Sequence, residues 1–237
     1  MFEYQGLQDM IFVVLYCVAA FSALLAAVYL LWRRGNAFAD DVGSSRVLRR
    51  WTAAFMAAVV GSHVWWYAIG VYWLADDWLV RTITVILLDH TTLVPLVMAM
   101  LLAMLQDRRR PLWPWLVAQA PVIVAGVVGI VLRDWFWGVE LSHYCQLAVA
   151  TAFVIYYIRA LRQYGRWLLD NYADLERKEV WQILVFAVAL FVFYEIYSSN
   201  AGEMTKEYLA HDITLVIIAF LVWRVETSQE LETEETE

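Results

Sequence analysis

The run IFVVLYCVAAFSALLAAVYLLW, from Ile11 to Trp32, decides the fold, because it contains no charged residue and is followed directly by Arg33 and Arg34. A transmembrane helix needs about 20 consecutive apolar residues, since each residue rises about 1.5 Å and the hydrocarbon core is about 30 Å thick. The run is therefore long enough to cross a bilayer once. It predicts a membrane-spanning helix that ends at a basic interface.

Further apolar stretches of similar length follow along the chain. We predict membrane spans at 51–74, 80–105, 112–132, 140–161, 180–198 and 204–223. Hydrophobic residues make up 62% of the 237 positions, a proportion that excludes an ordinary soluble domain. The predicted fold class is an all-α, seven-transmembrane helix bundle, with a membrane domain at 1–224 and an acidic cytosolic linker or tail at 225–237.

The basic residues predict the orientation of these spans. Most of the 17 Lys and Arg residues lie in or beside the links that follow the first, third and fifth spans. Only one lies in or beside each of the links after the second, fourth and sixth spans, namely Arg81, Arg133 and Lys206. Short cytoplasmic loops are enriched in Lys and Arg. We therefore expect the N-terminus outside and the C-terminus in the cytosol.

Polar residues inside the predicted spans gather between the outer surface and about the midplane. An ionisable group at the bilayer centre costs about 2.5–3.5 kcal/mol on insertion scales, and such groups usually face a polar cavity or a partner. We predict an outward-facing pocket that binds a small polar or cationic ligand from outside. Its predicted ligand-binding residues are His63, Trp66, Tyr67, Asp89, His90, His143, Glu195, Glu207, His211 and Asp212.

Some of these residues are also candidate metal ligands. Glu207 and His211 stand four residues apart on one helical face, and imidazole and carboxylate groups are ligands of zinc. The sequence does not identify a cofactor, but this arrangement makes zinc a candidate. The candidate ligands are His63, Asp89, His90 and His211.

Two alternative functions stay open on the same residues. One is a zinc-dependent intramembrane hydrolase, because Ser62 and His63 in span two, with an Asp in span three and a His in span seven, resemble ceramidase-like and adiponectin-receptor-like families. Those families carry His-x-x-x-His on the last helix, where this chain has Glu207 and His211. The other alternative is a small-solute or proton-coupled transporter. The interpretation we favour, a receptor, involves no catalysis by the chain.

The fifth span is predicted to continue into the cytosol as an amphipathic helix. Its apolar and aromatic residues recur at helical spacing, at Leu161, Tyr164, Leu168, Tyr172 and Leu175. Such a face would contact a second protomer or a downstream domain. We therefore expect a homodimer, with signal output through Leu168, Tyr172 and Leu175.

Two segments carry a resemblance to a known family. YGRWLLDNYADLERKEVWQ at 164–182 and LVWRVETSQELE at 221–232 resemble the membrane-embedded N-terminal half of bacterial AraC-type (helix-turn-helix) transcription regulators, which is related to modules that precede histidine kinases. In that family a seven-span module and an acidic linker lead to a cytoplasmic DNA-binding domain. The resemblance implies a sensor in the bacterial inner membrane. The output domain would follow Glu237, and these residues would bind no nucleic acid directly.

Overall fold

The computed structural model describes residues 7–33, 45–71, 77–171, 176–198, 203–228 and 231, and every regular element among them is a helix. The α-helices are α1 (Leu7–Trp32), α2 (Arg46–Trp65), α3 (Trp78–Ala103), α4 (Trp113–Ala118), α5 (Ala120–Leu132), α6 (Ser142–Asn171), α7 (Glu176–Ser198) and α8 (Glu203–Thr227). Two π-helical segments join them, η1 (Trp66–Val71) after α2 and η2 (Phe136–Leu141) before α6.

Length and composition make the chain an integral membrane protein. Six helical segments are long and apolar enough to cross a bilayer: Met10–Trp32, Arg46–Ile69, Trp78–Ala103, Trp113–Leu132, Phe136–Asn171 and Tyr208–Thr227. Within α7 the described apolar stretch is shorter, Val180–Tyr194. The all-helical membrane fold predicted from the sequence is confirmed.

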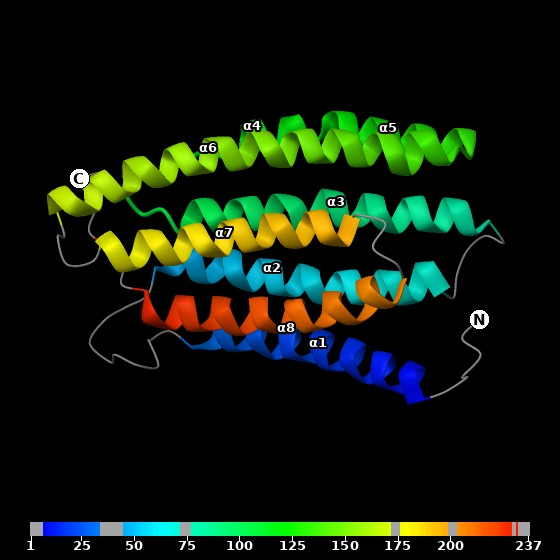
Figure 1. Cartoon of the computed structure of the whole chain (residues 1–237), viewed down its shortest axis with the longest axis horizontal. Coiled ribbons are helices and arrows are strands. Elements are labelled where there is room, and N and C mark those ends of the chain that lie inside the picture. Colours follow the sequence, from blue (N-terminus) through cyan, green and yellow to red (C-terminus); the bar gives the residue numbers. More distant parts are fainter. Residues whose placement is uncertain are drawn as a thin grey trace.

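The helices lie side by side along the long axis of the molecule, and successive passes reverse direction (Figure 1). α1 packs against α2 and α8, and α2 also packs against α3. On the other side of α3 lie α5 and α6, and α7 packs mainly against α6. The bundle thus has an α1–α2–α8 group and an α3–α5–α6–α7 group, which meet between α2 and α3 and between α7 and α8.

The hydropathy pattern does not predict where the helices depart from regular α-helix. The fourth pass is divided at Gln119 into α4 and α5, and Pro121 lies in the first turn of α5, where its missing N–H needs no partner. The π-helical turns of η1 and η2 both lie at the end of the bundle where α1 and α8 begin. Widened turns of this kind are common beside functional sites.

The large apolar core occupies the opposite end of the bundle. It comprises the last turns of α1, α3 and α8, the first turns of α2 and α7, and much of α6, where Tyr157, Tyr164 and Leu168 are almost fully buried. Close packing at this end leaves the polar in-span residues grouped toward the other end. The two ends of the bundle therefore have different chemistry.

Candidate functional site

The Asp89 carboxylate is a centre of polar contacts between α2, η1 and α3. Ser62 Oγ donates a hydrogen bond of 2.8 Å to Oδ1, and the indole nitrogens of Trp65 and Trp66 donate bonds of 2.9 Å to Oδ1 and 2.7 Å to Oδ2. Hydrogen bonds to a charged acceptor are stronger than those between neutral groups. Both oxygens of Asp89 are thus engaged, and the carboxylate joins α3 to the junction of α2 and η1.

A second group, which we call the His63–His211 cluster, brings together α1, α2 and α8. Its members are Phe12, Tyr16, His63 and His211. The His63 and His211 ring centroids are 5.5 Å apart, and the Tyr16 ring lies 4.7 Å from His63 and 5.3 Å from His211, edge-on to both. Phe12 covers His211 at 5.4 Å. The Tyr16 hydroxyl donates to the backbone carbonyl of His63.

The backbone orients the His63 imidazole within this cluster. Its Nδ1 lies 2.7 Å from the carbonyl oxygen of Val59, one helical turn earlier. In the tautomer that donates this bond, Nε2 carries the lone pair. That Nε2 is buried and has no hydrogen-bond partner among the residues that the structure describes. His63 therefore presents a buried acceptor to its surroundings.

A third group lies between α3, α6 and α7. The His143 ring stacks on Tyr194 with centroids 6.2 Å apart, and His143 also interacts electrostatically with His90 of α3. His90 is 9% exposed, and its Nδ1 has no hydrogen-bond partner in the described part of the chain. This group is separate from the His63–His211 cluster, which is built on other helices.

Six of the ten predicted ligand-binding residues lie in these three groups, namely Trp66 with Asp89, His63 with His211, and His90 with His143. Tyr67 and Asp212 are exposed, and Asp212 interacts electrostatically with the neighbouring His211. The side chains of Glu195 and Glu207 lie outside the described residues. Of the four metal candidates, only His63 and His211 share a group. No three His, Cys, Asp or Glu side chains among the described residues are placed to hold a metal ion.

At the core end of the bundle, α1, α2 and α8 meet again through a buried ion pair. Arg49 Nη2 of α2 lies 2.9 Å from Glu226 Oε1 of α8, and the two side chains are 8% and 2% exposed. Arg49 Nη1 donates a bond of 2.9 Å to the carbonyl oxygen of Arg33, directly after α1. Arg49 therefore joins the ends of all three helices.

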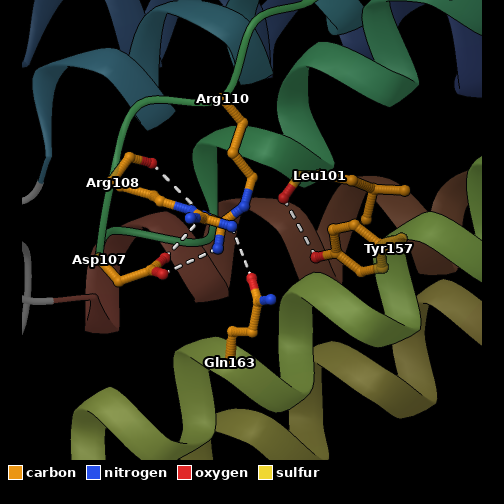
Figure 2. A network of polar contacts seen from close by, with 6 residues as sticks. All are labelled: Leu101, Asp107, Arg108, Arg110, Tyr157 and Gln163. Carbon is orange, nitrogen blue, oxygen red and sulfur yellow. Dashed lines mark hydrogen bonds and ion pairs between the residues drawn. The ribbon is translucent and has the colours of Figure 1, made fainter.

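The link between α3 and α4 contacts both α6 and the chain that follows α8. Arg110 binds Asp107 through bonds of 2.6 and 2.8 Å, which fixes the shape of the link (Figure 2). Arg108 donates a bond of 2.6 Å to Gln163 of α6, and Gln106 accepts one of 3.0 Å from the Leu231 backbone after α8. The link thus ties α6 to the chain that leaves α8.

Of the three residues predicted for signal output, the structure describes only Leu168. Leu168 is fully buried in the apolar core of this chain, while Leu169 beside it is half-exposed. Tyr172 and Leu175 lie outside the described residues. A charged substitution at Leu168 would therefore act on the core before any contact with a partner.

Sequence reasoning missed several members of these groups. Tyr16 lies in the most apolar span, where its only signal is a hydroxyl among aliphatic side chains. Arg49 and Glu226 were assigned to a basic link and an acidic tail, because residues that far apart in the chain share no periodicity. Gln146, a buried amide in α6, is not among the predicted site residues.

No protein family, curated protein or solved structure matches the chain. Its class therefore rests on the fold and composition: a helical integral membrane protein, with polar clusters toward one end of the bundle and a buried ion pair at the other.

Proposed function

We propose that the protein is the sensor module of a membrane receptor, with seven spans and the N-terminus outside. It couples an outward-facing polar site to a cytosolic transcription-regulator domain. One observation carries the proposal: α1, α2 and α8 make polar contacts with one another at both ends of the bundle. Tyr16, His63 and His211 meet at one end, and the Arg33 carbonyl, Arg49 and Glu226 meet at the other.

In this proposal the helices α2 and α8 couple the contacts at the two ends of the bundle. His63 and Arg49 lie on α2, and at about 1.5 Å per residue roughly 21 Å of helix separates them. His211 and Glu226 lie on α8 and are separated by roughly 22 Å. A helix is stiff over this length, so a shift of α8 against α2 at the polar end is transmitted to the ion pair. This span covers most of the hydrocarbon thickness of about 30 Å.

The proposed mechanism is a population shift between two packings of α8 against α2. A ligand shifts such an equilibrium only by the difference in its affinity for the two packings. Helix shifts of about 1–2 Å are a common form of such transitions. A buried ion pair responds to such shifts, because a displacement of about 1–2 Å breaks its hydrogen-bond geometry. The readout is the position of the chain after α8, which Gln106 and Glu226 hold. In a dimer, the half-exposed Leu169 side of α6 would contact the partner.

The proposal predicts that a change at the polar end alters the cytosolic end. In Tyr16→Phe the hydroxyl that binds the His63 carbonyl is removed and the aromatic ring is kept. We expect the distance between spin labels at Arg50 and Thr227, both exposed, to change by about 1–2 Å. Pulsed electron paramagnetic resonance in nanodiscs would measure it. In cells that carry the gene, the same variant should change a reproducible set of transcripts.

Tyr144→Phe is the matched control, because Tyr144 loses the same hydroxyl but is an exposed residue of α6. It should leave both the distance and the transcripts unchanged. Equal effects of the two variants, or none from Tyr16→Phe, would contradict coupling through α1, α2 and α8. Stoichiometric zinc in the purified protein, or solute flux through it, would instead favour the hydrolase or the transporter.

The proposed orientation predicts opposite labelling of the two bundle ends. In a background with Cys17 and Cys145 replaced by alanine, Asp134→Cys should react with an impermeant maleimide added to intact cells. Arg109→Cys should react only after the cells are opened. Both positions are exposed. Reaction of both cysteines from the same side would refute the orientation.

A further inference from the structure

The helices α3 and α6 are parallel, and one contact fixes their register. Both run in the same direction along the bundle (Figure 1), and the Tyr157 hydroxyl of α6 donates a bond of 3.1 Å to the Leu101 carbonyl of α3 (Figure 2). His90 lies eleven residues before Leu101, and Gln146 lies eleven residues before Tyr157. Eleven residues make about three full turns, so each residue returns to the same face of its helix. His90 and Gln146 therefore lie at about the same depth in the bundle.

These two side chains are buried without the hydrogen bonds that they require. Gln146 is 0% exposed, and neither its Nε2 nor its Oε1 has a partner among the described residues. His90 Nδ1 is also buried without a hydrogen-bond partner among these residues. Buried polar groups in proteins are almost always hydrogen-bonded, to protein or to ordered water. The two side chains thus bring both donor and acceptor groups into the interior at this depth.

Neighbouring groups extend this polar position toward α7. His143 lies one turn before Gln146 on α6, interacts with His90 and stacks on Tyr194 of α7. The Asp89 carboxylate, next to His90 in sequence, is bound to Ser62, Trp65 and Trp66 of the preceding pass. The described side chains of this group are therefore imidazole, amide and phenol, which suit a neutral occupant.

We propose that the space between His90, Gln146 and His143 is a binding site for ordered water. A water molecule both donates and accepts, and buried waters typically make about three hydrogen bonds to otherwise unsatisfied groups. Such a site holds α3, α6 and α7 together through the water instead of through direct side-chain contact. This inference is independent of the proposed sensor function, because it depends only on the satisfaction of buried polar groups.

Gln146→Met tests the site through the sign of a stability change. Methionine has a similar volume and no amide, so it removes the hydrogen bonds to the occupant and keeps the packing. If water fills the site, we expect Gln146→Met to lower the Tm by about 2–4 °C. If the amide is buried in a dry site, the substitution removes an unsatisfied polar group and the Tm should rise. A rise would overturn the proposal.

Gln163→Met serves as the control, because Gln163 lies on the same helix but bonds Arg108 at the surface. Its Tm should stay within about 1 °C of the wild type, since exposed substitutions have small effects. A fall in Tm equal to that of Gln146→Met would show that the loss reflects the helix and not the site.

Radical footprinting tests occupancy in the wild-type protein, whether or not the variant folds. Water bound at the site would give hydroxyl radicals beside His90 during an X-ray pulse, so His90 should be oxidised although it is buried. The fully buried Tyr157, which bonds protein only, should stay unmodified. Equal protection of both residues would overturn the proposal. Release of one small organic molecule per chain on denaturation would also overturn the proposal, because that molecule would then be the occupant of the site instead of water.

Discussion

Arg49→Met is expected to destabilise the protein by about 3–5 kcal/mol, because it leaves the Glu226 carboxylate buried without its partner charge. Methionine keeps the unbranched apolar stem of the side chain, and the substitution also removes the hydrogen bond to the Arg33 carbonyl. Unfolding by SDS in mixed micelles would measure it, followed by the loss of helical circular dichroism. A loss this large would leave a typical protein only marginally stable.

The surface pair of Arg133 and Asp77 provides the control for this prediction. Its atoms are 3.5 Å apart, and the two side chains are 72% and 24% exposed. Exposed pairs contribute about 0–1 kcal/mol, so Arg133→Met should have little effect. The double variant Arg49→Met with Glu226→Gln should recover much of the lost stability, because the buried carboxylate charge is then removed together with the guanidinium. Equal effects of Arg49→Met and Arg133→Met would show that water reaches the Glu226 carboxylate.

The membrane helices were predictable from the sequence because hydropathy acts over the length of a whole span. Ile11 to Trp32 contains no charge, and the helix α1 covers it. The π-helical turns were not predictable, because residues 66–71 and 136–141 have the same mixture of aromatic and small apolar residues as the regular helices around them. The widening of these turns depends on contacts with neighbouring helices, which a single helix does not encode.

The candidate site was predictable only in its composition. Depth along a span follows from counting residues, and this placed His63, Asp89 and His211 at similar levels. Which of these side chains come together depends on how each helix is rotated about its axis. Trp65 and Trp66 are directed toward Asp89 of α3. His63, which lies on the same turn of α2 as these tryptophans, contacts α1 and α8 instead. The hydrogen-bonded Asp89 also explains why two tryptophans stand in the middle of a span and not at an interface.

Gly129→Ala is expected to separate α5 from η2, because a Cβ at this position would overlap the backbone of Gly138. Helices in membranes associate closely where small residues let their backbones approach. Alanine gains about 1 kcal/mol over glycine in helix propensity, which opposes the effect. Overpacking costs about 1–3 kcal/mol and more where backbone must move, so the overlap outweighs the gain. The net result should be a clear loss of stability.

Gly126→Ala, one turn earlier on α5, is the comparison that separates backbone overlap from helix propensity. An added Cβ there would meet Leu87 Cδ1 at 2.9 Å, and the tip of a leucine side chain can rotate away. Its stability should therefore stay near that of the wild type or rise slightly. SDS unfolding of the two variants under identical conditions would measure the difference. If both glycines accept alanine equally well, then α5 and η2 are not in backbone contact, and this packing of the α3–α5–α6 side of the bundle is wrong.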